Sequence, residues 1–303
     1  MSHTRYFILA AAIIAAAGSV AGEEHAWSQP PTRNQLKATP GWVHRTIQSE
    51  FMPSVMGYSV VLPPGYDSET DRRYPVVYWL HGGGGNECSD VWNSRIWGKL
   101  SGEGEIGEVI LVYPNAGRSS YWDHHDGKVR MESFIVHELI PEVDATFRTD
   151  ARRQARAVHG FSMGASGALK FAIKYPELFC SAVAYGGGAI DLETTQDAFV
   201  KRFVQRNLNS DPELIRKNNT YRMLRENQDR LRKRGVRFLL ICGNEDAWKA
   251  SAVTFHEELR GSGLDCECLL LPGVGHEIGK LMQAKGRTAA LFQDDIFRSV
   301  SQN

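Results

Sequence analysis

Six short runs of apolar residues recur along the chain and constrain its fold more than any other feature. In chain order they lie at 74–80, 109–114, 155–160, 181–187, 236–243 and 266–273. Their apolar character is continuous rather than alternating, which indicates strands covered on both faces, as in a mostly parallel sheet. Two extended stretches, 42–51 and 58–66, come before them, separated by a turn-like segment at 53–57, and add two expected strands.

Helical segments separate these strands. In one segment apolar residues recur every four positions, which predicts a helix that buries one face and kinks at Pro141; they are Met131, Ile135, Leu139, Val143 and Phe147. A second helix is predicted to begin at Ser162 and to end before Pro176. Such strand–helix alternation predicts a right-handed, doubly wound α/β sheet with helices on both faces.

The N-terminus has the pattern of a secretory signal peptide. Arg5 is followed by the apolar run YFILAAAIIAAAG and then by the small-x-small sequence Ser19-Val20-Ala21. We expect cleavage near Ala21, so that 1–21 is a signal peptide and the mature protein is secreted or periplasmic without a stable membrane anchor. A retained anchor helix is the alternative. Residues 22–40, rich in Pro, Gln, Thr and Ser, are interpreted as a linker, and 41–303 as one α/β domain.

Charge and cysteine content exclude some classes of protein. Lys plus Arg and Asp plus Glu number 35 each, so no basic surplus favours nucleic acid or an anionic membrane as a partner. The five cysteines are an odd number, and two of them lie in or beside predicted strands, where a small buried hydrophobe is the simpler interpretation. No disulfide is assigned from the sequence.

A polar stretch at 190–235 interrupts the strand–helix rhythm. It is dense in Arg, Lys, Asn and Asp, and Asp211-Pro212-Glu213 is typical of a helix start, with Asp as N-cap and Pro at the first helical position. The stretch could be an insertion that caps a pocket or a solvated pair of helices.

The segment HGFSMGASG, 159–167, places Ser162 in the spacing G-x-S-x-G between a predicted strand and a predicted helix. A strand–turn–helix elbow of this kind exposes a serine hydroxyl at the sheet edge, and its glycines relieve crowding in the strained turn. A serine hydroxyl is a weak nucleophile and needs a base within hydrogen-bond reach. Ser162 is therefore the predicted nucleophile.

The base and the acid are expected downstream of the serine, in the order Ser, acid, His. Only His256 and His276 follow Ser162; His256 falls inside a predicted helix, whereas His276 lies in a loop after the last strand, where open α/β sheets bind ligands. His276 is the predicted base. Asp246, after the preceding strand, is the predicted acid, with its neighbour Glu245 as the alternative.

Glycines at the end of the third strand suggest an oxyanion hole. In this type of site one donor is the backbone N–H after the nucleophile, here Met163, and the second comes from a glycine-rich loop after the third strand, here HGGGG at 81–85. His81 is interpreted as a structural residue that organises this loop.

The stretch YWDHHDG, 121–127, contains clustered Asp and His residues. Adjacent residues rarely converge on one metal ion, so turn contacts are the preferred interpretation over a metal site. Tyr121 and Trp122 are predicted to line the acyl or aromatic subsite, and Trp248 is a further candidate wall. Neither a metal ion nor an organic cofactor is expected.

Together, YPVVYWLHGGGGNE, FIVHELIPEVDATFRTD, HGFSMGASGALKFA, GNEDAW and PGVGHE resemble the esterase D / putative esterase family of α/β-hydrolases, from about Tyr58 to about Ile296. The resemblance implies an α/β-hydrolase fold, a triad of Ser162, Asp246 and His276, and an oxyanion hole formed by the N–H groups of Gly83 and Met163. Gly82 or Gly84 is the alternative loop donor. The HGGGG loop and SYWDHHDGKVRMESF resemble the secreted feruloyl and acetyl-xylan esterase branch most.

We therefore expect a secreted serine esterase that acts on a small-molecule or polysaccharide ester such as feruloyl or acetyl xylan. An acyltransferase with a sugar or lipid alcohol as acceptor, or a peptidase, would use the same triad. A non-catalytic binding module on the same scaffold is the alternative from another class, although such modules usually lose a triad member.

Overall fold

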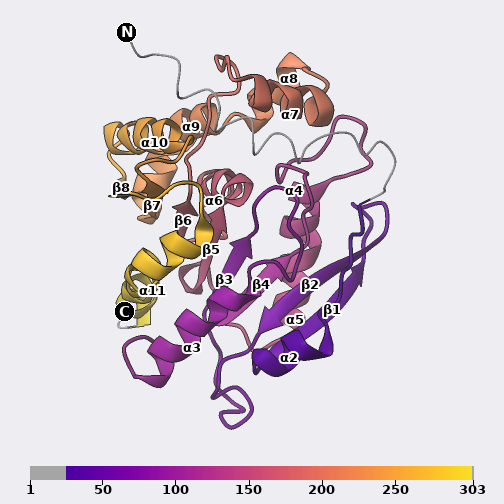
Figure 1. Ribbon diagram of the computed structural model, residues 1–303, viewed down its shortest axis with the longest axis vertical. Helices are drawn as coiled ribbons and strands as arrows, with labels where there is room; N and C mark the ends of the chain where they lie inside the picture. Colours follow the sequence, from indigo (N-terminus) through magenta and orange to yellow (C-terminus); the bar gives the residue numbers. More distant parts are fainter. Residues whose placement is uncertain (1–24, 302–303) are drawn as a thin grey trace.

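The computed structural model describes residues 25–301 of the 303-residue chain, so the predicted signal peptide at 1–21 lies outside the described residues. Eight strands form one sheet in the order β1-β2-β4-β3-β5-β6-β7-β8 (Figure 1). β2 pairs antiparallel with β1 and β4, and every other pair is parallel. The strands are β1 (Trp42–Gln48), β2 (Val55–Val61), β3 (Val76–Leu80), β4 (Ile110–Pro114), β5 (Arg156–Phe161), β6 (Ser181–Tyr185), β7 (Arg237–Gly243) and β8 (Asp265–Leu271).

This sheet confirms the predicted mostly parallel α/β architecture, and all eight expected strands are present. The boundaries of the first two strands differ: β1 ends at Gln48 and β2 at Val61, earlier than expected, and the turn expected at 53–57 is shorter because β2 already pairs with β1 from Val55. The backbone there extends the ladder, so the turn is confined to the residues before Val55.

Helices cover both faces of the sheet, which explains why the strands are apolar without alternation. Val77 and Trp79 of β3 pack with α3 (Ser94–Gly102) and α11 (Ile278–Ser301) on one face. Alternate residues of the same strand, such as Tyr78, face the other side, because side chains alternate across a strand. The helices there are α4 (Met131–Phe134), α5 (Ile140–Thr146), α6 (Met163–Lys174), α9 (Thr220–Arg234) and α10 (Lys249–Gly261).

The helix predicted from the four-residue repeat is present in three pieces. A π-helical turn, Ile135–Leu139, separates α4 from α5, and all five residues of the repeat are buried. A strict repeat of four exceeds the 3.6 residues of an α-helical turn, and the wider π-helical turn keeps the apolar stripe on the core. The π-helical turn ends just before Pro141, which lies in the first turn of α5. The irregularity is therefore close to the position of the predicted kink.

The polar stretch 22–40 differs from the linker interpretation in its described part. It contains α2 (Arg33–Ala38), whose N-terminus is closed by a capping box. The carbonyl of Trp27 accepts a hydrogen bond from the N–H of Gly57, and the N–H of Gln29 donates to the carboxylate of Glu87. Residues 27 and 29 are therefore tied to the domain by backbone hydrogen bonds, whereas the side chains of α2 are exposed.

The stretch 190–235 folds into α7 (Ala198–Leu208), α8 (Pro212–Asn218) and α9. Asp211 caps α8 as predicted, since its side chain accepts from two amide groups at the start of the helix. α9 buries one face in the main core against α6, so it is part of the domain rather than a solvated helix. Figure 1 shows α7 and α8 together at the upper end of the molecule in this view.

Candidate active site

The predicted site residues follow four parallel strands and meet at one edge of the sheet. The HGGGG loop follows β3, Ser162 follows β5, Asp246 follows β7 and His276 follows β8. Parallel strands all end at the same edge, so segments distant in sequence converge there. The structure brings Ser162, Asp246 and His276 into direct contact.

A continuous chain of hydrogen bonds joins these three side chains. His276 Nδ1 lies 2.8 Å from Asp246 Oδ2, and His276 Nε2 lies 2.8 Å from Ser162 Oγ. An ionised carboxylate only accepts hydrogen bonds, so Nδ1 carries the hydrogen and Nε2 presents its lone pair to the serine hydroxyl. This tautomer is the one that can take a proton from Ser162.

The structure distinguishes Asp246 from the alternative Glu245. The Asp246 side chain is fully buried, and its second oxygen accepts from the N–H of Trp248 at 2.8 Å. Glu245 is exposed and makes no hydrogen bond with His276. Two neighbouring carboxylates thus point in different directions, and only Asp246 orients the imidazole.

Backbone strain and close packing shape the turn that holds Ser162. Ser162 has φ 56° and ψ −115°, a conformation that L-residues rarely adopt. A Cβ at Gly160 would lie 2.2 Å from the carbonyl oxygen of Gly164, and one at Gly164 would lie 1.9 Å from that of Leu80. Both motif glycines are therefore required for the close contact between β5, α6 and the end of β3.

Gly164→Ala is expected to destabilise the fold by at least about 3 kcal/mol, because the new methyl group meets backbone atoms that cannot rotate away. Gly98→Ala is the matched control: Gly98 is also helical, and a Cβ there meets nothing within 4 Å, so a gain of up to about 1 kcal/mol is expected. Urea unfolding measures both. Equal midpoints for the two variants would contradict the packing argument.

Backbone amides beside Ser162 are available as oxyanion donors. Met163 is the first residue of α6, so its N–H has no partner within the helix. The positive end of the helix dipole at this N-terminus also favours a nearby negative charge. The N–H of Gly84 is occupied, since it donates to the carbonyl of Gly117 at 3.0 Å. Among the described residues, the N–H groups of Gly82 and Gly83 have no hydrogen-bond partner. This removes Gly84 from the candidate donors.

His81 holds the glycine loop, as the sequence suggested. The N–H of Ala116 donates to its Nε2 at 2.9 Å, so its Nδ1 carries the hydrogen and donates to the carbonyl of Gly82 at 2.7 Å. Burial lowers the pKa of His81 to about 4, because the charged form would lose its hydration. The imidazole therefore stays neutral and keeps both contacts near neutral pH.

A cavity of about 400 Å³ opens beside Ser162 and His276. Trp122 and Trp248 line it, as predicted. The prediction for Tyr121 is wrong: this residue is fully buried and does not line the cavity. Left-handed backbone at positions 120 and 121, with φ 58° and 57°, turns the Tyr121 side chain into the core instead.

α7 supplies much of the apolar wall, and the sequence interpretation missed these residues. Phe199, Val200 and Phe203 line the cavity from α7. The Phe199 ring lies 4.9 Å from that of Phe203 and 5.9 Å from that of Trp248, between ring centroids. The available signal was the group of apolar residues at 198–200, 203, 204 and 208 within the otherwise polar stretch 190–235.

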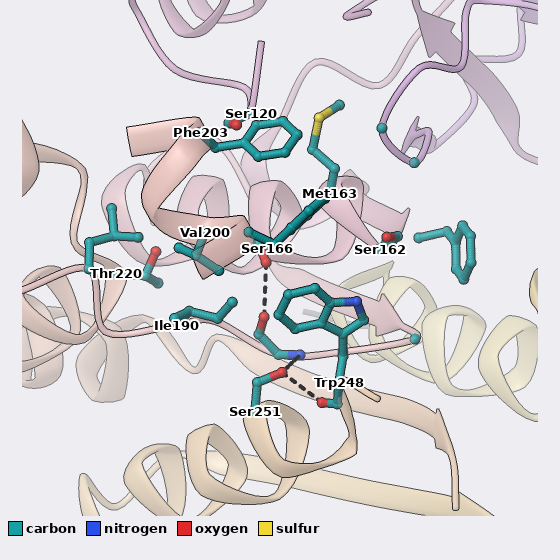
Figure 2. A pocket seen from close by; sticks show the side chains of 18 of the residues that line it. Ser120, Ser162, Met163, Ser166, Ile190, Val200, Phe203, Thr220, Trp248 and Ser251 are labelled. Atoms are coloured by element: carbon teal, nitrogen blue, oxygen red, sulfur yellow. Dashed lines mark hydrogen bonds between the residues drawn. The ribbon is translucent and has the colours of Figure 1, made fainter. Parts of the chain in front are cut away.

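Most hydroxyl groups at the cavity surface already have partners. Ser166 Oγ donates to the carbonyl of Gly188, and Ser251 Oγ donates to that of Trp248, as Figure 2 shows. Thr220 also lines the cavity and is nine-tenths buried, and its hydroxyl has no partner among the described residues. In the view of Figure 2, Thr220 lies at the left and Ser162 towards the right, with Val200 and Ile190 between them.

The stretch YWDHHDG makes the turn contacts that were expected of it. Asp123 accepts from the N–H and the hydroxyl of Ser133 at 3.0 and 2.5 Å, and Asp126 accepts from the N–H of Lys128. Within residues 25–301, no group of three or more His, Cys, Asp or Glu side chains is arranged to hold a metal ion. The same range contains all five cysteines, and each of them is a free thiol.

Within the described range, none of the helices combines the length and the apolar character needed to cross a bilayer.

Comparison with known proteins places this geometry in a family. A model of the family described as Putative esterase matches residues 49–228, more than half of the chain. An esterase of Mycobacterium tuberculosis is 36% identical over 153 residues, covering 49% of this chain and 32% of that protein. An endo-1,4-beta-xylanase/feruloyl esterase of Xylanibacter ruminicola is 30% identical over 168 residues, covering 52% of this chain and 23% of that protein. The chain thus spans a third or less of these curated relatives.

Solved structures share the fold over most of the chain. A ferulic acid esterase superimposes with a TM-score of 0.70 at 24% identity, covering 84% of this chain and 98% of that one. An S-formylglutathione hydrolase from Agrobacterium tumefaciens superimposes with a TM-score of 0.67 at 20% identity, covering 84% and 95%. These similarities confirm the α/β-hydrolase fold, and the match to the family model shows that the chain belongs to the Putative esterase family.

Proposed function

We propose that this protein is a serine carboxylic-ester hydrolase that forms an acyl-enzyme at Ser162. The observation that carries the proposal is the unbroken hydrogen-bonded chain from Ser162 through His276 to Asp246, at the wall of a cavity. An ester offers an electrophilic carbonyl carbon and an oxygen that becomes negative on attack. The site holds a nucleophile, a base and amide donors suited to these two atoms.

In the first half of the reaction, Ser162 Oγ attacks the carbonyl carbon while His276 Nε2 takes its proton. Asp246 holds the imidazole and stabilises its cationic form. The N–H groups of Met163 and Gly83 are proposed to hold the oxyanion. His276 then gives its proton to the leaving alcohol oxygen as the ester C–O bond breaks.

In the second half, water replaces the alcohol. His276 removes a proton from water as the water oxygen attacks the acyl carbon. His276 then returns this proton to Ser162 Oγ as the bond between Oγ and the acyl carbon breaks, which releases the acid and regenerates the free serine. An acceptor alcohol in place of water would give acyl transfer by the same steps. Product analysis in the presence of an added alcohol measures the ratio of the two reactions.

The cavity favours an acyl group larger than acetyl. An acetyl group on Ser162 would be too small to reach most of the apolar side chains that α7 and Trp248 contribute to the cavity. Thr220, the hydroxyl without a partner, offers a hydrogen bond to a polar group at the distal end of the acyl chain. Asn218 adds a second polar, nine-tenths buried lining residue. A hydroxycinnamoyl group combines an apolar body with such a polar end.

We propose a carbohydrate ester such as feruloyl xylan as the substrate, with acetyl xylan as the alternative. The relative from Xylanibacter ruminicola, named as a xylanase/feruloyl esterase, supports this choice. The sequence of residues 1–21 supports secretion or export to the periplasm.

Paired substrates test the acyl group. The mature protein is expected to cleave methyl 4-hydroxycinnamate with a higher kcat/KM than methyl cinnamate. For both esters, the ratio of kcat/KM to the rate of uncatalysed hydrolysis is expected to exceed that for p-nitrophenyl acetate. Thr220→Val removes the hydroxyl at nearly constant shape and is expected to reduce the preference for the hydroxylated ester by about three- to tenfold, the contribution of one hydrogen bond. Activity on methyl cinnamate is the internal control. An unchanged ratio in Thr220→Val would exclude this side chain from acyl recognition.

A further inference from the structure

Tyr121 lies between the two parts of the chain that provide the oxyanion donors. Its hydroxyl donates to the carbonyl of His81 at 3.0 Å, directly before Gly82 and Gly83. Its ring packs on Gly167 of α6, where an added Cβ would lie 2.8 Å from the ring. Gly167 is one helical turn from Met163, so one side chain contacts both the glycine loop and the helix that starts with the second donor.

A buried ion pair holds the backbone of Tyr121. Lys170 Nζ, on α6, donates to the carbonyl of Tyr121 at 2.6 Å and to Glu132 at 2.7 Å. Lys174 and the Tyr175 hydroxyl also donate to Glu132. The Lys170 side chain is 1% exposed, so rearrangement of this cluster would leave a buried charge without a partner.

The charges in this cluster favour the paired state. Burial alone would raise the pKa of Glu132, but the adjacent Lys170 and Lys174 hold it at about 2. Glu132 is therefore ionised at any ordinary pH and keeps its hydrogen bonds. The left-handed conformations of Ser120 and Tyr121 are costly, and this set of contacts compensates for them.

We infer that Tyr121 is a positioning residue that sets the distance between the oxyanion donors of the glycine loop and of Met163. The inference rests on the proposed ester hydrolysis at Ser162. Donors stabilise a developing oxyanion only when both lie at hydrogen-bond distance from the position it will occupy. The Tyr121 hydroxyl restrains the loop through His81, while its ring restrains the loop relative to α6.

Tyr121→Phe tests this role, because it removes the hydroxyl and keeps the ring against Gly167. We expect kcat to fall about tenfold with KM nearly unchanged, less than the roughly 10²–10³-fold loss of a whole donor. Affinity for an aryl trifluoromethyl ketone, which forms a tetrahedral oxyanion on Ser162, is expected to fall by the same factor. Incorporation of 3-fluorotyrosine at position 121 restores the hydroxyl and is expected to restore both values.

Tyr113→Phe is the matched control. Tyr113 is also buried, and its hydroxyl donates to Asn93 at 2.8 Å, away from the cavity. Both variants lose one buried hydrogen bond and are expected to lose similar thermal stability, but only Tyr121→Phe should change kcat and ketone affinity. Equal kcat and ketone affinity in the two variants would assign Tyr121 a merely structural role and overturn the inference.

Gly167→Ala adds a methyl group on α6 against the same Tyr121 ring. This variant tests the inference if Tyr121→Phe does not fold. Its Cβ must displace the Tyr121 ring, so ketone affinity and kcat are expected to fall together, and their retention would overturn the inference.

Labelling of Ser162 by a fluorophosphonate distinguishes failure of the proposed function from failure of the inference about Tyr121, because labelling needs no ester turnover. A wild-type protein that neither labels nor hydrolyses esters refutes the proposed function, and the inference with it. Equally fast labelling of wild type and Tyr121→Phe refutes the inference alone.

Discussion

Replacing Ser162 by alanine is expected to reduce ester hydrolysis by roughly 10⁶-fold in kcat, the effect of removing the nucleophile from comparable triads. No other described hydroxyl hydrogen-bonds to His276 Nε2. The residual rate should reflect binding and the oxyanion donors alone. Initial rates with p-nitrophenyl acetate and methyl ferulate measure the loss, and mass spectrometry after fluorophosphonate treatment locates the adduct.

Ser166→Ala provides the matched control for this prediction. Ser166 lines the same cavity on the first turns of α6, but its hydroxyl donates to the carbonyl of Gly188 rather than to His276. Loss of one such hydrogen bond contributes about 1 kcal/mol, so activity should stay within about tenfold of wild type. Comparable activity in Ser162→Ala and wild type would refute the nucleophile assignment.

Asp246→Asn is expected to lower kcat by roughly 10⁴-fold, as measured for the corresponding change in another Ser-His-Asp triad. An amide can present its NH₂ group to His276, which favours the tautomer with the hydrogen on Nε2. That hydrogen would point at Ser162 and remove the lone pair that accepts its proton. The fold should be retained, because the two side chains have nearly the same shape; circular dichroism and urea unfolding check this.

Glu245→Gln is the control for Asp246→Asn. It makes the same carboxylate-to-amide change one residue earlier, on an exposed side chain. Its kcat is expected to stay within about twofold of wild type, since exposed charges interact weakly. A large loss in Glu245→Gln together with a small one in Asp246→Asn would reverse the assignment of the acid.

The strands, and the meeting of Ser162, Asp246 and His276 at one edge of the sheet, could be predicted from the sequence because their signals are local. Each strand is a continuous apolar run, and each proposed catalytic residue directly follows one of them. Once the order of elements is known, a parallel sheet brings these segments to one edge. The choice between Asp246 and Glu245 needed the structure, since adjacent residues differ only in the direction of their side chains.

Side chains placed by backbone conformation or by distant contacts could not be assigned from sequence. Tyr121 looked like a cavity residue because it neighbours Trp122, yet two left-handed residues reverse its direction. The polar stretch 22–40 was interpreted as a linker, because composition does not show the backbone hydrogen bonds by which Trp27 and Gln29 contact the domain. Phe203 lines the cavity only because α7 packs across it.

The position of α7 has a consequence for how related enzymes could diverge. The three proposed catalytic residues follow β5, β7 and β8. The cavity residues Phe199, Val200 and Phe203 come from a separate segment between β6 and β7. Substitutions on this one helix would reshape the cavity while leaving Ser162, Asp246 and His276 in place. The shape of the cavity and the chemistry at its edge can therefore change independently during evolution.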